Sequence, residues 1–457
     1  MKLEKSLARL RQLLPAGELR IEEAVRDRYR GDKWFAVHRP DAVALPRSTK
    51  SVAAILHFAS KNRIPVTPRG AGFGYVGGCV PARGGIVLSL ERMNRIREIS
   101  AEDFVAVVQA GVITQTLQAA VEKAGLFYPP DPASRADCSL GGNIATNAGG
   151  PRCLKYGVTR DYVLGLEVVL AGGSVVRLGS RTHKNKTGYD LHRLFVGSEG
   201  TLGIVTEATL KLLPLPPYRA ALSVGFRSMK AAAQTIREIF RAGFLPCAVE
   251  VADAFTLAAA RRRTGSKMLE GCQAHLIVEL DGQRRSVLQE IKSLRRNVRR
   301  FSPAFILQAE GDAECETLWQ LRREFSYALR DTGLTKLNED IVVPRGKLEE
   351  LFQFAARLQR KHGLPVACFG HAGDGNIHVN VMADMNAPNA AARCDAALDD
   401  LFAQVLAWKG VITGEHGIGL AKKKWWPLAT TQEVRALHAS VKRALDPHLI
   451  LNPGKFV

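Results

Sequence analysis

The stretch Arg69-Gly70-Ala71-Gly72-Phe73-Gly74-Tyr75-Val76-Gly77-Gly78 holds five glycines in nine residues and directly follows an expected short strand at 64–68. Glycine carries no Cβ, so the backbone amides of such a loop can turn inward and form a nest for phosphate oxygens. Arg69 would add a fixed positive charge beside this nest. The alternative interpretation is a glycine-rich connection that binds no ligand.

The spacing Gly72-x-Gly74-x-x-Gly77 matches the dinucleotide fingerprint of nicotinamide-binding domains, but its surroundings do not. That fingerprint requires a helix directly after the loop. Here Pro81 and Gly84 interrupt any helix, and Ile86-Val87-Leu88-Ser89-Leu90 is typical of a strand. The sequence therefore predicts a phosphate cradle and excludes a nicotinamide Rossmann domain.

Two further clusters of small residues follow at 139–150 and 197–206. The first combines glycines with Asn143 and Asn147, a composition that suits backbone packed closely against a flat ring. The second ends in an expected strand. Between and around these clusters, hydrophobic periodicity predicts helices at 49–61 and 114–124, a strand at 105–108 and a hairpin at 166–178.

A polar turn separates two histidines in the stretch Phe369-Gly370-His371-Ala372-Gly373-Asp374-Gly375-Asn376-Ile377-His378-Val379-Asn380. A strand after the turn would aim His378 and Asn380 at one face, because alternate residues of a strand share a face. The turn can bring His371 beside His378, giving two imidazoles for one metal ion, with a third ligand within 413–419. The alternative is a polar hairpin whose histidines bond nearby carbonyls, since the spacing matches no standard metal motif.

The length of 457 residues and a hydrophobic content of 46% allow two or three globular domains with ample cores. With 64 Lys and Arg against 44 Asp and Glu, the formal charge is +20, which favours anionic substrates, acidic partners or an anionic membrane surface. Basic runs such as Arg261-Arg262-Arg263 lack aromatic interleaving and match no nucleic-acid-binding motif, so nucleic acid is not an expected partner.

The eight cysteines are scattered, which excludes C-x-x-C metal ribbons and cysteine runs that hold iron–sulfur clusters. Leu3, Leu7, Leu10 and Leu14 recur at helical spacing, so the first residues predict an amphipathic helix and not a signal peptide. No apolar run reaches the length of a membrane span. A cytoplasmic location is expected, with peripheral contact at the inner membrane face left open.

Together, Arg69–Gly78, Gly141–Gly150 with Pro151-Arg152, and Gly197–Thr206 resemble the flavin-binding half of the vanillyl-alcohol-oxidase/p-cresol-methylhydroxylase family. The stretches His371–Asn380 and Gly414–Gly419 are similar to its D-2-hydroxyacid dehydrogenase branch. That branch includes D-lactate dehydrogenases, the flavin subunit of glycolate oxidase and D-2-hydroxyglutarate dehydrogenase.

The resemblance implies an α+β fold: a p-cresol-methylhydroxylase-type FAD-binding domain of two subdomains, a ferredoxin-like α+β cap that binds substrate, and a helical C-terminal return to the flavin. The expected divisions are an N-terminal helical segment at 1–37, the FAD-binding domain at 38–216, the cap at 217–410 and the C-terminal segment at 411–457. Pro214-Leu215-Pro216-Pro217 marks the main boundary in the sequence itself.

The resemblance also implies FAD bound without a covalent link, because the first glycine loop carries no histidine. The implied FAD-binding residues are Arg69, Gly70, Ala71, Gly72, Phe73, Gly74, Gly77, Gly78, Pro130, Ser139, Gly141, Gly142, Thr146, Asn147, Gly149, Gly150, Gly200, Ile204, Val205, Glu415 and Asn452.

A divalent metal ion, with zinc the expected one, is further implied at His371, His378 and Glu415. Two neutral imidazoles and a carboxylate leave the open position that a catalytic zinc requires. The hydroxyl and carboxylate of the substrate would fill this position, which lowers the hydroxyl pKa.

His416 matches the general base of the branch, and Arg322 matches the arginine that forks a substrate carboxylate. Both are implied as catalytic and substrate-binding residues. Ser326, Lys336 and Asn380 match further substrate contacts. For Arg322 and its neighbour Arg323, a solvated helix face is the alternative interpretation.

The predicted activity is oxidation of a D-2-hydroxy acid of the lactate or glycolate type to the 2-oxo acid, with hydride passing to flavin N5. The alternatives are a D-2-hydroxyglutarate dehydrogenase and a non-catalytic flavoprotein subunit of a glycolate-oxidase-like complex. The electron acceptor is left open among oxygen, a quinone, a carrier protein and an iron–sulfur subunit. Assembly as a homodimer is also left open.

Overall fold

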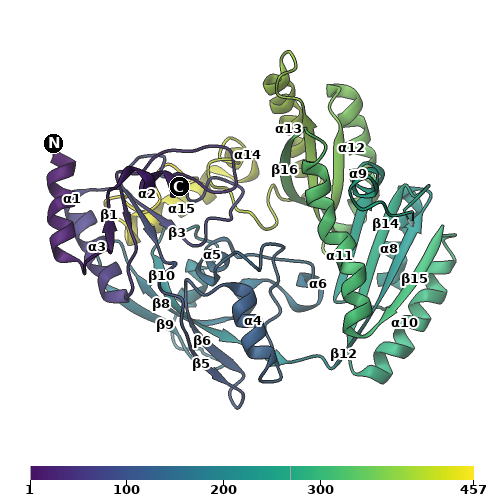
Figure 1. Ribbon diagram of the computed structural model, residues 1–457, viewed down its shortest axis with the longest axis horizontal. Helices are drawn as coiled ribbons and strands as arrows, with labels where there is room; N and C mark the ends of the chain where they lie inside the picture. Colours follow the sequence, from purple (N-terminus) through teal and green to yellow (C-terminus); the bar gives the residue numbers. More distant parts are fainter. Residues whose placement is uncertain (1, 268) are drawn as a thin grey trace. The chain divides into compact units, whose positions relative to one another are not determined.

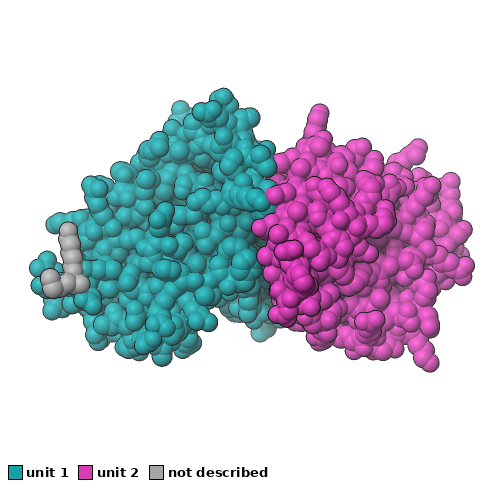
Figure 2. All heavy atoms as spheres, turned by 90° about the horizontal axis from the view of Figure 1, so that it is seen from above, with its two compact units in different colours: residues 1–149, 158–215, 415–457 teal, residues 150–157, 216–414 magenta. Residues whose placement is uncertain are grey.

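The computed structural model describes residues 2–267 and 269–457 (Figure 1). The chain forms two compact units, which Figure 2 colours separately. Unit 1 comprises residues 1–149, 158–215 and 415–457, and unit 2 comprises 150–157 and 216–414. The short segment 150–157 therefore leaves the first unit and packs with the second, an arrangement that the expected linear division did not include.

The first sheet of unit 1 has the order β1-β2-β4-β3. Its strands are β1 (Leu19–Arg20), β2 (Ala42–Ala44), β3 (Val66–Arg69) and β4 (Ile86–Ser89). Both β2 and β3 pair in parallel with β4. The helix α3 (Thr49–Asn62) connects β2 to β3, which lets these two strands run in the same direction. The Ser48 side chain caps this helix by accepting from the Ser51 amide. The apolar faces of α3 and of α1 (Lys2–Leu13) pack on the sheet to form the core.

The second sheet of unit 1 is antiparallel, with the order β5-β6-β10-β8-β9. Its strands are β5 (Ile96–Ser100), β6 (Val105–Gln109), β8 (Val163–Val169), β9 (Val175–Gly179) and β10 (Ile204–Lys211), and β7 (Leu126–Phe127) pairs separately with β11 (Leu213–Pro214). Burial alternates along β10, so one face of this sheet packs inward. The predicted hairpin at 166–178 is formed by β8 and β9.

The remaining helical elements of unit 1 are short, apart from the last. They are α2 (Glu23–Arg28), α4 (Thr114–Glu122), α5 (Leu140–Thr146), η1 (Thr159–Tyr162), α7 (Leu191–Phe195), α14 (Trp426–Ala429) and α15 (Gln432–Leu445). The helix α5 lies inside the second glycine cluster, for which the sequence indicated close backbone packing and no helix or strand was assigned. It ends at Asn147, which adopts a left-handed conformation with φ of 52°.

Unit 2 is built on one antiparallel sheet with the order β15-β12-β14-β13-β17-β18-β16. Its strands are β12 (Tyr218–Phe226), β13 (Ala248–Asp253), β14 (Ala274–Gly282), β15 (Phe305–Glu310), β16 (Thr335–Val342), β17 (Val366–His371) and β18 (Asn376–Ala383). Every residue of β17 and β18 is buried, so both faces of the sheet are covered. The α+β class predicted from the sequence is confirmed.

Two layers of helices provide this cover (Figure 1). The helices α9 (Ala254–Thr264) and α11 (Gly311–Arg330) pack together over one face, where Phe325 and Leu329 meet Ala252 and Phe369 of the sheet. The other helical elements of the unit are α6 (Cys153–Tyr156), α8 (Met229–Arg241), α10 (Arg284–Arg299), η2 (Arg345–Lys347), α12 (Leu348–His362) and α13 (Ala390–Ala407). Within the residues that the structure describes, no helix combines the length and apolar character needed to cross a bilayer.

Candidate active site

The first glycine loop of unit 1 lies against the second. Residues 70–85 form no helix, as predicted, and the chain returns to strand at Ile86. A Cβ atom placed on Gly70 would collide with Ser139 Oγ and would lie 3.3 Å from the amide nitrogen of Gly142. Glycine at position 70 is therefore required by close approach of the two loops.

The third cluster joins the same assembly through backbone hydrogen bonds. The Glu199 amide donates to the Ala145 carbonyl at 2.8 Å, and a Cβ on Gly200 would overlap the Pro68 ring. Asn452 then ties the loops together, because its Nδ2 donates to the carbonyls of Gly78, at 3.1 Å, and Glu199, at 2.8 Å. Segments from three distant parts of the sequence therefore surround one location in unit 1.

This location fits a large polar ligand such as FAD. The Ser139 Oγ and Asn452 Oδ1 atoms are buried and bond to none of the described residues. A buried polar atom without a partner costs about 1–3 kcal/mol, so a ligand that bonds these atoms would be favoured. The backbone at Gly78 is open as well, since a Cβ there would meet nothing within 4 Å. Both features match the backbone-lined cradle expected from the sequence.

Arg69 and the N-terminal segment 31–34 cover the first loop. The Arg69 guanidinium donates to the Gly31 carbonyl and lies directly over Gly72. The Trp34 ring lies against Gly77, and the Lys33 amide donates to the Gly74 carbonyl at 2.9 Å. Arg69 was expected beside the nest. Segment 31–34 was not expected there, because it carries no glycine cluster or other local signal of its own.

The other residues expected to bind FAD lie in or beside these loops, with Gly150 counted in unit 2. Pro130 is the exception, and its carbonyl accepts from Gln118 Nε2 at 3.0 Å. Thr146 Oγ1 donates to the Gly142 carbonyl at 3.2 Å, and Asn147 Oδ1 accepts from the Arg160 amide at 2.8 Å. The remaining members of this set are Ala71, Phe73, Pro130, Gly141, Gly149, Ile204 and Val205.

In unit 2 the two histidines of the polar turn come together on the β17–β18 hairpin. The ladder pairs Phe369 with His378 and His371 with Asn376, and the imidazole centroids of the two histidines are 5.7 Å apart. Gly375 adopts a φ of 86°, and a Cβ there would collide with the Val343 carbonyl, so the turn depends on glycine.

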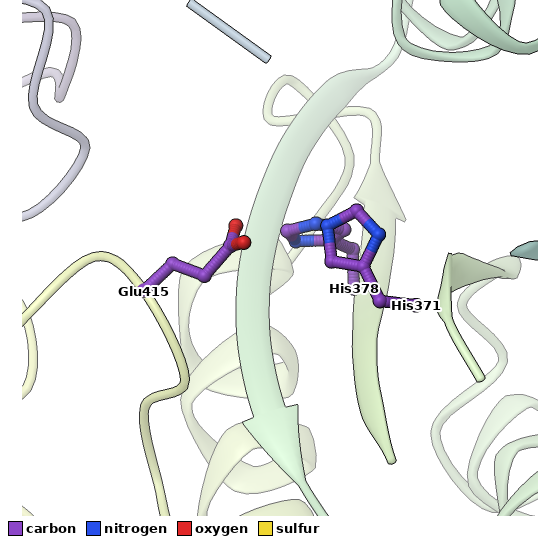
Figure 3. A group of neighbouring side chains, drawn as sticks. All are labelled: His371, His378 and Glu415. Carbon is purple, nitrogen blue, oxygen red and sulfur yellow. The ribbon is translucent and has the colours of Figure 1, made fainter. Parts of the chain in front are cut away.

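Glu415 completes a group of three possible metal ligands. One ligand atom from each of His371, His378 and Glu415 lies within 4.8 Å of the others, and Figure 3 shows the Glu415 carboxylate pointing toward the imidazoles. Glu415 directly follows Gly414, whose amide donates at 2.9 Å to a carboxylate oxygen of Asp340. Because Asp340 pairs with His378 across β16 and β18, it holds the chain beside the hairpin. Two nitrogen donors and one oxygen donor suit a divalent ion such as zinc.

Glu250 on β13 links the histidine pair to Arg322 on α11. Its Oε1 lies 2.6 Å from His371 Nδ1, and its Oε2 accepts from Arg322 Nε at 2.6 Å. Burial raises the pKa of Glu250, but the attraction of His371 and Arg322 outweighs burial and lowers the pKa below its ordinary value. Glu250 was not predicted as a site residue, although it is a lone carboxylate inside the apolar run Cys247–Ala252.

Arg322 and Arg323 lie in different surroundings, although they are neighbours on the helix α11. The Arg322 guanidinium lies over the Phe369 ring, 4.8 Å from its centroid, and is largely buried. Arg323 instead pairs with Glu316 on the exposed side of α11. The solvated-face interpretation therefore applies to Arg323, while Arg322 faces the sheet.

The sheet face that carries His378 also carries three further polar residues, Lys336, Asn338 and Asn380. Lys336 Nζ donates to Ser326 Oγ at 2.8 Å, and burial lowers the pKa of Lys336 to about 8. Asn380 pairs with Asn338 across the strands. The Oδ1 atoms of both asparagines are buried and bond to no described residue, so this face retains unused hydrogen-bond acceptors.

His416 belongs to unit 1, where its ring centroid lies 5.2 Å from that of Tyr75. The turn that follows it is fixed by Glu199, whose carboxylate accepts from the amides of Ile418 and Gly419 at 2.8 and 2.9 Å. Burial raises the pKa of this carboxylate. The predicted substrate-binding residues are therefore divided between the units. Unit 2 contains Arg322, Ser326, Lys336 and Asn380, and unit 1 contains His416.

Comparisons with known proteins decide the family. Residues 40–179 match the FAD binding domain, and residues 215–456 match the C-terminal domain of FAD linked oxidases. The chain belongs to the FAD-linked oxidase family. The resemblance inferred from the sequence motifs is confirmed by these matches.

This FAD-linked oxidase is similar over most of its length to three curated proteins. It is 40% identical to the glycolate oxidase subunit GlcD of Bacillus subtilis, with 91% of this chain and 88% of that protein covered. It is 37% identical to a D-lactate dehydrogenase of Anaerostipes hadrus, covering 91% and 89%. It is 36% identical to a D-2-hydroxyglutarate dehydrogenase of Xanthomonas citri pv. viticola, covering 98% and 95%.

Solved structures show the same fold. The p-cresol methylhydroxylase structure with substrate bound superposes with a TM-score of 0.81 at 19% identity, covering 99% of this FAD-linked oxidase and 96% of that chain. The 4-ethylphenol oxidase of Gulosibacter chungangensis gives a TM-score of 0.80 at 21% identity, covering 99% and 96%. At these identities the likeness establishes the fold alone.

Proposed function

We propose that this FAD-linked oxidase is a metal-assisted dehydrogenase that converts a D-2-hydroxy acid of the lactate or glycolate type to its 2-oxo acid. The observation that carries the proposal is the grouping of His371, His378 and Glu415, with Glu250 joining His371 to the buried Arg322. The relatives named for glycolate, D-lactate and D-2-hydroxyglutarate support the same substrate class.

Arg322 would bind the substrate carboxylate. Its Nε is occupied by Glu250, which leaves both Nη groups for a bidentate contact with a second carboxylate. The Phe369 ring beneath the guanidinium supports its plane. A planar, pre-oriented fork suits the carboxylate that every 2-hydroxy acid carries.

His371, His378 and Glu415 would hold a divalent ion, with zinc the expected one. When bound there, the ion would supply a positive charge that lowers the pKa of the substrate hydroxyl. His416 would accept the hydroxyl proton, since histidine is the side chain that most often acts as a general base. FAD, when bound, would accept the hydride that leaves the α-carbon with two electrons. The substrate loses one proton and one hydride, which balances oxidation of the alcohol to the ketone.

A D-2-hydroxyglutarate dehydrogenase is the second candidate, and Lys336 favours it. The Lys336 ammonium lies next to the Ser326 hydroxyl on the sheet face that carries His378 and Asn380. Together they could bind the second carboxylate of a dicarboxylic substrate. With its pKa lowered to about 8, Lys336 is still mostly charged at neutral pH.

For reoxidation of the flavin we propose an acidic carrier protein or an acceptor at an anionic membrane surface, with slow reaction toward oxygen. A formal charge of +20 favours encounter with such partners. Stopped-flow mixing of substrate-reduced enzyme with air-saturated buffer would measure the oxygen reaction. Reoxidation fast enough for turnover, with stoichiometric peroxide, would make the protein an oxidase.

The substrate proposal is tested by anaerobic titration of the FAD-loaded protein with D-lactate, glycolate and D-2-hydroxyglutarate, while the absorbance of the oxidised flavin is followed. We expect bleaching by at least one of these acids and none by L-lactate. Bleaching by none of them would exclude a dehydrogenase of this class and favour a non-catalytic flavoprotein subunit. Preference for D-2-hydroxyglutarate would select the second candidate.

A further inference from the structure

Glu250 is a fully buried carboxylate whose two oxygens serve two different groups. Its exposed fraction is 1%. Oε1 lies 2.6 Å from His371 Nδ1, and Oε2 lies 2.6 Å from Arg322 Nε. Both distances are short, as expected for charge-assisted hydrogen bonds. The strand β13 aligns Glu250 directly opposite His371 on β17, so the contact is set by the ladder and not by a flexible loop.

This arrangement determines which nitrogen of His371 can bind a metal. An ionised carboxylate only accepts hydrogen bonds, so Nδ1 must carry the proton that faces Glu250. The other ring nitrogen, Nε2, then carries the lone pair of the ring and is the atom that can act as a metal ligand. Carboxylates that hold a ligand histidine in this way fix its tautomer and its ring orientation.

The same carboxylate also determines the direction of Arg322. Guanidinium nitrogens lie in one plane, so a bond at Nε fixes where the two Nη groups point. The centroid of the Phe369 ring lies 4.8 Å from the guanidinium carbon of Arg322. The ring therefore restricts rotation of the guanidinium out of its plane. Movement of Glu250 would therefore displace the histidine and the arginine together.

We propose that Glu250 is a positioning residue that couples the metal site to the substrate-carboxylate site by fixing His371 and Arg322 at once. This inference rests on the proposed function, because it assumes that His371 binds a metal and that Arg322 binds a carboxylate. It adds that neither site reaches full affinity without Glu250. Loss of the carboxylate would weaken metal binding and carboxylate binding in the same variant.

Glu279 on β14 provides a matched control within the same sheet. It is also fully buried and also pairs with arginines, Arg152 at 3.2 Å and Arg219 at 3.1 Å. Trp319 Nε1 donates to it at 2.6 Å. No histidine of the metal group contacts it among the described residues. A role limited to stabilising buried charge would make Glu250 and Glu279 equivalent.

The test compares the wild type with Glu250→Gln, Glu279→Gln and His378→Ala, all as FAD-loaded full-length chains. Glutamine offers one acceptor oxygen in place of two, so His371 or Arg322 loses its partner in Glu250→Gln. Zinc affinity is measured by competition with a chromogenic chelator. Affinity for oxalate, a dicarboxylate without a C–H bond to oxidise, is measured from the flavin absorbance in metal-free protein.

We expect Glu250→Gln to lower zinc affinity about 10–100-fold, and to weaken oxalate binding in the metal-free protein as well. Glu279→Gln should leave both affinities within about twofold of the wild type, because Glu279 touches neither site. Wild-type zinc affinity in Glu250→Gln would overturn the coupling while leaving the proposed function intact. Equal losses in both variants would reduce Glu250 to a stabilising role and overturn it too.

Two other results would contradict the proposed function without bearing on the role of Glu250. A wild type that binds no zinc, or a His378→Ala variant that binds it as tightly as the wild type, would remove the metal site itself. Nitrogen-15 spectra of the histidines in the wild type give a readout that needs no variant to fold. Protonated Nδ1 and metal-bound Nε2 at His371 support the coupling, and the reverse assignment overturns it.

Discussion

The candidate ligand sites of the two units are built from different parts of the chain. In unit 1 the predicted FAD location is lined by backbone, at loops where Gly70, Gly78 and Gly142 carry no side chain. In unit 2 the candidate metal and carboxylate groups are side chains, among them His371, His378 and Arg322, that project from a sheet and a helix. A backbone site is sensitive to added atoms, and a side-chain site is sensitive to removed ones. Substitutions should therefore separate cofactor binding from metal binding.

His378→Ala should have the largest effect, because it removes one of two imidazoles from the candidate metal group. We expect loss of bound metal and a fall in kcat of at least about 100-fold, with FAD still bound. Metal content by mass spectrometry and the flavin spectrum measure the two outcomes. The exposed His183 provides the control, His183→Ala. Full turnover in a metal-free preparation would contradict the side-chain site.

Gly70→Ala should produce the opposite result. The added Cβ would collide with Ser139 Oγ, so the two glycine loops must separate. We expect retained FAD after gel filtration to fall about tenfold or more, while zinc binding by His371, His378 and Glu415 persists. Gly172→Ala is the matched control, since a Cβ there meets nothing within 4 Å. Equal FAD content in the two variants would show that close packing at Gly70 does not matter.

Arg322→Lys tests whether a fork is needed or only a positive charge. Lysine keeps the charge but loses planar bidentate geometry, so KM for the hydroxy acid should rise about 10–100-fold. Arg323→Lys, on the exposed side of the same helix, should leave KM unchanged. Steady-state kinetics with an artificial electron acceptor measures both. An unchanged KM in Arg322→Lys would place the substrate carboxylate elsewhere.

Asn452→Ala should have a smaller effect. It removes two hydrogen bonds, to the carbonyls of Gly78 and Glu199, which stabilise the folded chain by about 1–3 kcal/mol together. We expect a lower Tm and several-fold weaker FAD binding, with unchanged zinc affinity. Thermal unfolding with and without added FAD measures the change. A loss of zinc affinity without a loss of FAD would contradict the separation of the two units.

Lys336 predicts a pH effect that depends on the substrate. Burial lowers its pKa to about 8 from the ordinary value of 10.5, so its charge is present below pH 8 and lost above it. KM for D-2-hydroxyglutarate should rise as pH increases through 8, and KM for D-lactate should not. Between about pH 8 and 10.5 the unfolded chain binds this proton and the folded chain does not, so this group makes stability rise with pH. Lys336→Met should abolish both dependences.

The sequence predicted the backbone site better than the side-chain site, for a physical reason. Glycine clusters are local signals, so the loop 69–78 and the absence of a following helix could be recognised directly. The helix α5 was missed because Gly141, Gly142 and Asn143 have low helix propensity, and packing inside unit 1 overrides that preference.

The side-chain site depends on register across distant strands. His371 and His378 were found because only a short turn separates them. Glu250 lies 121 residues before His371, and its partnership follows from the order in which β13 and β17 pair. The alternative in which the histidines bond only carbonyls does not describe His371, whose Nδ1 faces a carboxylate. No pattern in one sequence specifies such a pairing.

Asn452 also has a consequence for the order of biosynthesis. The hydrogen bond between Asn452 and Gly78 joins residues that lie 374 positions apart in the sequence. The neighbouring Leu451 forms a parallel β-bridge with Val66 of β3. Most of unit 2 is one continuous stretch, 216–414, that leaves the ribosome earlier than residues 415–457. Residues 216–414 of unit 2 are therefore available to fold on the nascent chain before Asn452, which contacts the glycine loops, has been synthesised. The two hydrogen bonds of Asn452 to Gly78 and Glu199 can therefore form only after residue 452 has been synthesised.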